Sequence, residues 1–337
     1  MSNERSITAE AASNIAFVKY WGARDLERVE PANPSISMTL SQCRSICSAT
    51  FFEGQSGADE ILLVESDGVG EADQPAPPAF SERILAHLDR LRERVGASGR
   101  FRIATRNTFP AAAGIASSAS GFAALSLAVS RALGMDPNDQ QLADLARSSG
   151  SGSATRSAMG GYVRWPGSGS EMIDQIADET HWDLCDLVAL VQTEAKKVSS
   201  LDGHRRAPTS PYYDGRLEQL GARLDEVTAA ILDRDFDRLG AVVEEDAIDL
   251  HVIAMTSKPP IYYWKPGTLA VLEAVRDLRD EGVAAWSTMD AGANVHVICE
   301  PKNARNVEQR LRGCSAVEDV LVDRVGGGPV WREGAEL

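Results

Sequence analysis

The chain has 337 residues, of which 43% are hydrophobic and 25% charged, a composition typical of a globular protein large enough for two lobes. Its net charge of −15 argues against general nucleic-acid binding, which needs a basic surface. The sequence has no apolar run of about 18 residues, the length that spans a membrane. Its N-terminal segment, MSNERSITAEAA, lacks the apolar centre of a signal peptide. We therefore expect a cytoplasmic protein that binds neither nucleic acid nor membrane.

Alternating residues predict the strands of the first half, and apolar residues at helical spacing predict its helices. The expected strands are residues 8–18, 35–50, 61–64, 100–106, 161–165 and 187–192. The expected helices are residues 82–95, 122–133 and 142–148.

In the second half of the chain, helices and strands are expected to alternate less regularly. Its expected helices are residues 217–231, 236–250, 269–278 and 303–311, and its expected strands are residues 284–289, 295–299 and 320–325. Because strands and helices are mixed without βαβ order, the whole pattern indicates an α+β fold. We place the change of lobe near residue 195, which gives an N-terminal lobe of residues 1–194 and a C-terminal lobe of residues 195–337.

The five cysteines form no CxxC pair, which indicates reduced, inert thiols. They are Cys43, Cys47, Cys185, Cys299 and Cys314. Cys43 and Cys47 have a spacing that suits zinc ligands on a helix. The alternation of Ile36, Met38 and Leu40 before them favours a strand in which both thiols pack into the core.

A small-residue segment, FPAAAGIASSASG (109–121), follows a predicted strand and leads into an apolar helix. Such a loop lets backbone N–H groups surround phosphate oxygens at a helix N-terminus, and Ser117 and Ser118 add hydroxyls for phosphate or Mg²⁺. The pattern favours a nucleoside triphosphate as ligand. The alternative is a tight turn in which serine only caps a buried helix.

A second segment rich in glycine and serine, GSGSATRSAMGG (150–161), contains Ser151, Ser153 and Arg156. An arginine offers two parallel donors that match a carboxylate or a phosphate, so these residues form a candidate anion site. Taken alone, the segment fits a flexible loop with a surface arginine equally well.

Two further side chains are candidates for chemistry. Asp290 lies in the turn MDAGAN (289–294), where it either acts as a general base or hydroxyl-orienting group, or only forms an Asx-turn. Lys19 begins KYWG (19–22) and either has a distant acidic partner or keeps its charge in water. The basic segment KKVSSLDGHRR (196–206) either adds to an anion site or faces solvent.

The histidines show no catalytic spacing. His87 and His181 are expected at the periphery of the fold, and His251 and His296 in apolar surroundings.

Together these segments resemble the mevalonate diphosphate decarboxylase group of the GHMP kinase superfamily, over nearly the whole chain. Several motifs in the right order are more specific than any single loop. The matching stretches are NIAFVKYWG (14–22), NPSISMTLS (33–41), FPAAAGIASSASGFAAL (109–125), SGSATRSAMGGYV (151–163), VSSLDG (198–203), KPPIYY (258–263) and MDAGANV (289–295).

The resemblance implies a two-lobed GHMP kinase-like fold with a central cleft, in which a ribosomal protein S5 domain 2-like lobe precedes a ferredoxin-like lobe. It also implies a homodimer that binds ATP at the serine loop and a phosphorylated mevalonate in the cleft. The implied ATP contacts are Ala113, Gly114, Ala116, Ser117 and Ser118, with Ser118 also a candidate contact for Mg²⁺. The implied substrate contacts are Asn14, Tyr20, Ser151, Ser153, Arg156 and Ser200.

Three residues take catalytic roles under this resemblance. Asp290 orients or deprotonates the tertiary 3-hydroxyl, which attacks the γ-phosphoryl group. Lys19 supports the reacting groups electrostatically, and Arg156 holds the carboxylate end of the substrate. Phosphate is a better leaving group than hydroxide, so its departure together with loss of CO₂ gives an alkene.

At two positions where the family pattern has a cationic residue, this sequence has an uncharged one. Members that act on the diphosphate usually read KYWGKR and often SSRDGM, whereas this chain reads KYWGAR and SSLDGH, with Ala23 and Leu201 at the two positions. Each phosphate-facing cation contributes about 1.5–3 kcal/mol through charged hydrogen bonds. Their loss favours mevalonate 5-phosphate as substrate, although Arg24, His204 or Arg205 can restore charge from another direction.

The resulting hypothesis is an ATP-dependent phosphomevalonate decarboxylase that makes isopentenyl phosphate in an alternative mevalonate pathway. The alternatives are a diphosphomevalonate decarboxylase, a mevalonate 3-kinase that releases no CO₂, and a nucleotide-binding regulatory protein. Simple GHMP kinases commonly have a catalytic aspartate shortly after the serine–glycine of the second glycine- and serine-rich segment, where this chain reads SGSATR (151–156) without a carboxylate. The regulatory alternative is disfavoured because Lys19, Arg156 and Asp290 are all present.

Overall fold

Two long antiparallel strands, β1 (Glu4–Val18) and β4 (Ser35–Glu53), form the centre of the first sheet. The computed structural model describes residues 4–64, 74–76, 78–110, 117–167, 169, 172–192 and 198–337. Both strands mix aliphatic residues with alanine and serine and are buried on both faces over most of their length. The sheet has the order β14-β1-β4-β7-β5-β6, and β8 and β9 extend from β4. The other bounds are β5 (Glu60–Leu63), β6 (Gln74–Pro75), β7 (Gly99–Asn107), β8 (Tyr162–Trp165), β9 (Asp174–Ala177) and β14 (Val330–Glu333).

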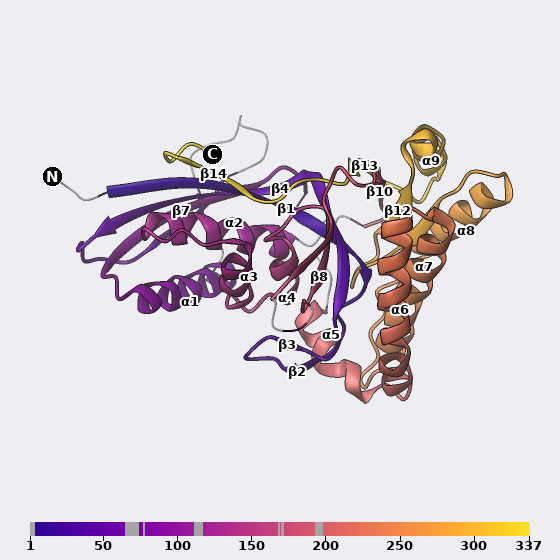
Figure 1. Ribbon diagram of the computed structural model, residues 1–337, viewed down its shortest axis with the longest axis horizontal. Helices are drawn as coiled ribbons and strands as arrows, with labels where there is room; N and C mark the ends of the chain where they lie inside the picture. The colour runs from indigo at the N-terminus through magenta and orange to yellow at the C-terminus, as the bar shows by residue number, and fades with distance from the viewer. Residues whose placement is uncertain are drawn as a thin grey trace.

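Four helices cover one face of this sheet (Figure 1). They are α1 (Pro78–Val95), α2 (Ser117–Ala132), α3 (Asp139–Arg147) and α4 (Gly152–Arg156). Most of α2 is buried, because its alanines and serines allow it to lie close to β1 and β4. These helices share one core with the sheet, in which Leu88, Phe101 and Leu125 take part.

A second, four-stranded sheet has the order β11-β12-β10-β13 with antiparallel pairs. Its strands are β10 (Cys185–Leu190), β11 (Trp286–Thr288), β12 (Val295–Cys299) and β13 (Asp319–Arg324). The helices of this half are α6 (Tyr213–Asp233), α7 (Phe236–Thr256), α8 (Pro266–Asp280) and α9 (Pro301–Gly313). The long helices α6 and α7 run side by side, and their apolar stripes pack in one core with β10 and β12.

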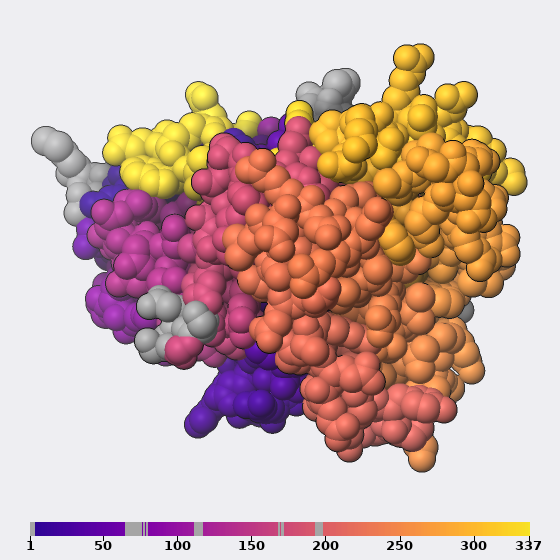
Figure 2. Space-filling model, turned by 45° about the vertical axis from the view of Figure 1, so that its right-hand side comes forward, coloured from indigo at the N-terminus to yellow at the C-terminus, as the bar shows by residue number. Residues whose placement is uncertain are grey.

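Two small pieces lie where the two halves meet. The β2 (Ala23–Asp25) and β3 (Glu30–Pro31) strands form a hairpin, and α5 (Ser200–Arg206) lies beside it (Figure 1). The chain then ends on the first sheet, because β14 pairs with β1. In Figure 2 the yellow C-terminal residues accordingly cover part of the indigo and magenta half of the molecule.

The predicted α+β class is confirmed, as are most of the predicted elements. The strands β2, β3, β6, β9 and β14 were not predicted, because runs of two to four residues are too short to show a period. The predicted strand at 284–289 is limited to the three residues of β11. Among the helices that the structure describes, none has the length and apolar character needed to cross a membrane.

Candidate active site

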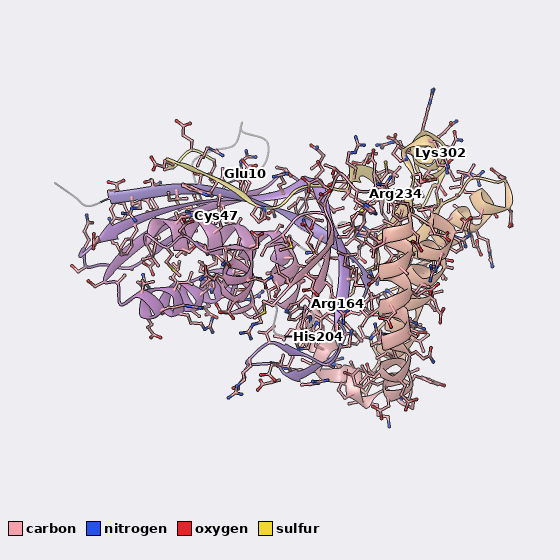
Figure 3. All side chains as sticks on the ribbon, viewed as in Figure 1. Glu10, Cys47, Arg164, His204, Arg234 and Lys302 are labelled. Carbon is pink, nitrogen blue, oxygen red and sulfur yellow. The ribbon has the colours of Figure 1, made fainter. Side chains whose placement is uncertain are left out.

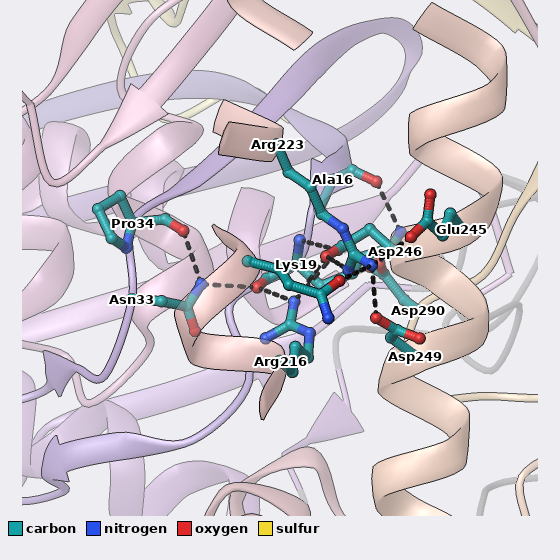
Figure 4. A network of polar contacts seen from close by, with 11 residues as sticks. Ala16, Lys19, Asn33, Pro34, Arg216, Arg223, Glu245, Asp246, Asp249 and Asp290 are labelled. Carbon is teal, nitrogen blue, oxygen red and sulfur yellow. Dashed lines mark hydrogen bonds and ion pairs between the residues drawn. The ribbon is translucent and has the colours of Figure 1, made fainter. Parts of the chain in front are cut away.

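Lys19 directly follows β1 and reaches Asp290, which lies between β11 and β12 in the other half of the molecule (Figure 4). Its Nζ lies 2.9 Å from Oδ1 of Asp290 and donates to the carbonyl oxygen of Ala16 at 2.6 Å. The lysine side chain is 2% exposed and the aspartate side chain 29% exposed. Lys19 therefore has the distant acidic partner, and the alternative of a solvated ammonium is wrong.

The charges around Asp290 keep it ionised. Burial by itself raises the pKa of this carboxyl, but the charge and hydrogen bond of Lys19 outweigh burial and bring the pKa below its usual range. His296 and Arg156 act in the same direction as Lys19. A partly exposed carboxylate of this kind can accept a hydrogen bond from a substrate hydroxyl.

Arg156, at the end of α4, is 3% exposed, so the alternative of a surface arginine is wrong. Its Nη1 donates to Oγ of Ser35 at 2.6 Å, and its Nε donates to Oδ1 of Asn14 at 3.3 Å. Burial lowers the pKa of Arg156 to about 10, while Asp290 and Tyr20 oppose this shift. The guanidinium is therefore charged at neutral pH.

Asn14 joins β1 to the turn of α4 that carries the predicted serines. Its Nδ2 donates to the carbonyl oxygen of Ser153 at 3.2 Å and to Oγ of Ser157 at 2.8 Å. The hydroxyls of Ser151 and Ser153 lie 3.3 Å apart. The structure thus brings Asn14, Arg156 and these two serines into one polar cluster.

Tyr20 lies between this cluster and α5. Its ring stacks on His204 with centroids 4.1 Å apart and meets Trp165 edge-on at 5.1 Å. A Cβ on Gly152 would come within 2.6 Å of the Tyr20 ring, so only glycine fits at this close approach. Burial raises the pKa of Tyr20 to about 12, and the phenol therefore remains protonated.

The two positions that lack the family's cations lie one on the β2–β3 hairpin and one on α5. Ala23 begins β2 and is half-buried, whereas Leu201 in α5 is 44% exposed. Nδ1 of His204 accepts from the backbone N–H of Gly22 at 3.0 Å, and Figure 3 shows this histidine beside the hairpin. Arg205 already pairs with Asp202 at 3.4 Å. Ser200 is the exposed first residue of α5.

Ser117 and Ser118 form the start of α2, with Ser117 half-buried and Ser118 exposed. The first turn of this 16-residue helix contains no acidic residue. Backbone N–H groups and hydroxyls at such an N-terminus suit a phosphate or an anion–Mg²⁺ complex. The predicted contacts Ala113, Gly114 and Ala116 lie outside the described residues.

Sequence reasoning missed several charged groups around Lys19 and Asp290. Asp246 of α7 accepts from the backbone of Lys19 at 2.7 Å. His296 of β12 pairs with the buried Asp186 of β10 at 2.7 Å, and burial raises the pKa of Asp186 although the histidine opposes this. The sequence showed the apolar neighbours of His296, but it did not show this buried acidic partner.

Two other histidines also differ in part from expectation. Burial lowers the pKa of His251 to about 3, and its ring bonds to the backbone of Asp290, so it is a neutral support behind the carboxylate. His87 was expected at the periphery and is instead fully buried, with Nε2 lying 2.9 Å from Oγ of Ser126.

Two family models match the chain, one for each half. Residues 11–177 match the diphosphomevalonate decarboxylase-like N-terminal domain, and residues 186–330 match the mevalonate 5-diphosphate decarboxylase C-terminal domain. A phosphomevalonate decarboxylase of Haloferax volcanii is 32% identical over 93% of this chain and 94% of its own length. A diphosphomevalonate decarboxylase of Ganoderma lucidum is 33% identical over 88% of this chain and 78% of its own.

Solved structures of such enzymes superpose on nearly all of the chain. Mevalonate diphosphate decarboxylase from Enterococcus faecalis gives a TM-score of 0.87 at 33% identity, with 98% of this chain and 100% of the other covered. A structure described as MDDEF in complex with MVAPP, AMPPCP and magnesium gives 0.88 at 34% identity, with the same coverage. The fold is accordingly the two-lobed GHMP-like fold that the sequence predicted. The chain belongs to the diphosphomevalonate decarboxylase family.

Proposed function

We propose that this enzyme converts mevalonate 5-phosphate, with ATP, into isopentenyl phosphate, ADP, phosphate and CO₂. The observation that carries this choice is the pair of uncharged residues, Ala23 and Leu201, at the positions where a diphosphate would meet a lysine and an arginine. Two of the basic residues nearby have other partners, because Arg205 pairs with Asp202 and His204 accepts from Gly22 through Nδ1. The similarity to the Haloferax volcanii phosphomevalonate decarboxylase supports the proposal.

ATP and Mg²⁺ are the cosubstrate and metal of this proposal. The related complex with AMPPCP and magnesium supports both, and the N-terminus of α2, with two serines and no acidic residue in its first turn, suits a phosphate. The residues that would hold the nucleotide are Ala113, Gly114, Ala116, Ser117 and Ser118, with Ser118 also toward the metal. Bound ATP supplies the phosphoryl group that turns the 3-hydroxyl into a leaving group.

The chain's own side chains divide the remaining work. Asp290 accepts the hydrogen bond of the 3-hydroxyl and takes its proton as the oxygen becomes phosphorylated. Lys19 holds Asp290 ionised and stabilises negative charge nearby. Arg156, with Asn14 and the serines of α4, binds the substrate carboxylate until CO₂ leaves. Ser200 and Tyr20 belong to the phosphate end of the same site.

Three other properties stay predictions. The division of the chain after residue 194 is tested by limited proteolysis between β10 and α5. The homodimer is tested by light scattering of the purified protein. A cytoplasmic location is tested by cell fractionation.

A diphosphate substrate is the second candidate, because several relatives that match most of the chain are diphosphomevalonate decarboxylases. The deciding experiment measures ATP-dependent CO₂ release from mevalonate, its 5-phosphate and its 5-diphosphate. We expect the highest kcat/KM with the 5-phosphate. A clear preference for the diphosphate would reject the substrate assignment, and ADP formation without CO₂ would identify a 3-kinase.

A double variant, Ala23→Lys with Leu201→Arg, sharpens this experiment. Two added cations should raise kcat/KM for the diphosphate relative to the monophosphate by about tenfold or more, given about 1.5–3 kcal/mol for each charged hydrogen bond. Leu232→Arg, at a 51% exposed position of α6, controls for added charge alone. An equal ratio in both variants would mean that residues 23 and 201 do not contact the phosphate end.

A further inference from the structure

The main chain of Lys19 is held on both sides by side chains, two of which come from the other half of the molecule (Figure 4). Its backbone N–H donates to Oδ2 of Asp246 at 2.7 Å. Its carbonyl oxygen accepts from Nη2 of Arg216 at 3.0 Å and from Nδ2 of Asn33 at 2.9 Å. Lys19 lies one residue beyond the end of β1, and these bonds satisfy backbone groups that would otherwise be buried without partners.

Asp246 is the centre of this arrangement. Its side chain is 0% exposed and lies 3.0 Å from Nη2 of Arg216 and 3.2 Å from Nη1 of Arg223. Arg223 also pairs with Glu245 at 2.6 Å and with Asp249 at 2.7 Å. Buried ion pairs of this kind contribute little net stability compared with apolar packing, so stability alone does not account for the cluster.

The same lysine carries the ammonium that meets Asp290. With its N–H and C=O both fixed, Lys19 can move its Nζ only through side-chain torsions, and Nζ is itself held by Ala16 and Asp290. The other groups that face Asp290 are Arg156 from α4, His296 from β12 and the neutral His251 from α7.

We propose that Asp246, together with Arg216, is a positioning pair that fixes the backbone of Lys19 so that its ammonium stays on Asp290. Both side chains are buried, Asp246 fully and Arg216 to 3% exposure, so the pair acts through its bonds to the Lys19 backbone. This inference rests on the proposed function, in which Asp290 and Lys19 act on the substrate hydroxyl.

The test is Asp246→Asn, which keeps the shape of the side chain and one acceptor but removes the charge between two arginines. Loss of alignment by about 1 Å lowers rates by about 100-fold, so we expect kcat to fall by that order. The KM for ATP should change by less than about twofold, because the proposed nucleotide site is at the N-terminus of α2 and not at this cluster. The acid limb of the kcat–pH profile should move to higher pH, since burial raises the pKa of Asp290 when Lys19 no longer opposes it.

Asp249→Asn is the matched control. Asp249 lies one turn further along α7, is a third exposed and pairs with the same Arg223, so its loss should leave kcat and the pH profile unchanged. Equal effects of both variants, or an unchanged pH profile in Asp246→Asn, would overturn the proposal. If Asp246→Asn does not fold, Arg216→Met decides, because methionine keeps an apolar stem but has no N–H to donate to Asp246 or to the Lys19 carbonyl, and it should show the same kcat and pH changes.

A measurement on the unliganded protein separates this inference from the proposed function. The pKa of the Asp290 carboxyl, followed by ¹³C NMR, should rise in Asp246→Asn and stay at the wild-type value in Asp249→Asn. If the wild-type enzyme releases no CO₂, the proposed function is rejected, but the pKa of Asp290 should still rise in Asp246→Asn. No shift in an active enzyme would reject the positioning pair alone.

Discussion

The contact between Lys19 and Asp290 decides what the carboxylate can do. With its pKa held below the usual range, Asp290 is a weak base in the free enzyme. Under the proposed function it therefore serves first as a hydrogen-bond acceptor that orients the hydroxyl, and proton transfer follows only as the oxygen loses electron density to phosphorus. The negative charge, more than the shape of the side chain, is the feature that matters.

Asp290→Asn removes this charge and keeps the shape. We expect kcat to fall by about 10²–10⁴, the range typical of a lost general acid–base group, while the Kd for ATP stays close to wild type. Steady-state CO₂ release and calorimetric titration with ATP check the two parts. A variant that retains most of its activity would contradict the assigned mechanism.

The resemblance of several motifs to the decarboxylase family led from the sequence to Lys19 and Asp290, which the structure brings to 2.9 Å. No motif marks Asp246. Its one sequence signal is a carboxylate within the apolar stripe of a helix, three residues after Val243 and four before Leu250, where helical spacing predicts an apolar side chain. A charge at a core-facing position needs a partner, but the sequence does not tell which distant segment supplies it.

At the scale of elements, α5 and the segment 19–22 form one packed unit. Gly203 of α5 lies so close to the indole ring of Trp21 that a Cβ would overlap it. His204 of the same helix stacks on Tyr20 and accepts from Gly22. The basic segment predicted at 196–206 is thus in part a short helix whose contacts fix the site, although the sequence showed only its charge.

Gly203→Ala tests this packing. Overpacking typically costs about 1–3 kcal/mol, and displacement of α5 should also raise the KM for the phosphorylated substrate. Gly215→Ala in α6 is the control, because a Cβ there meets nothing within 4 Å and alanine favours a helix. Thermal unfolding and substrate KM are measured for both. Unchanged values in Gly203→Ala would show that α5 shifts freely without affecting the site.

At the scale of the whole molecule, a carboxylate of the second sheet, Asp323, binds the first sheet where the pairing of β4 with β1 is irregular. The register of β4 against β1 jumps between Thr39 and Arg44. The N–H groups of residues 41–43 in this gap donate to the side chain of Asp323 from β13, at 2.7–2.9 Å. Alternation predicted both strands, but a register jump and its distant acceptor leave no periodic trace in the sequence.

Asp323→Asn should weaken this connection, because an amide offers one acceptor oxygen where the buried carboxylate offers two. Hydrogen bonds to a charged group contribute about 1.5–3 kcal/mol each, and partial replacement by the amide leads us to expect a loss of about 2–4 kcal/mol in the free energy of unfolding. Asp319→Asn, in the same strand but 58% exposed, removes a surface ion pair with Arg312 and should cost less than about 1 kcal/mol. Urea unfolding of both variants measures the difference. Equal losses would mean that the apolar contact between the two halves holds them together without help from the carboxylate.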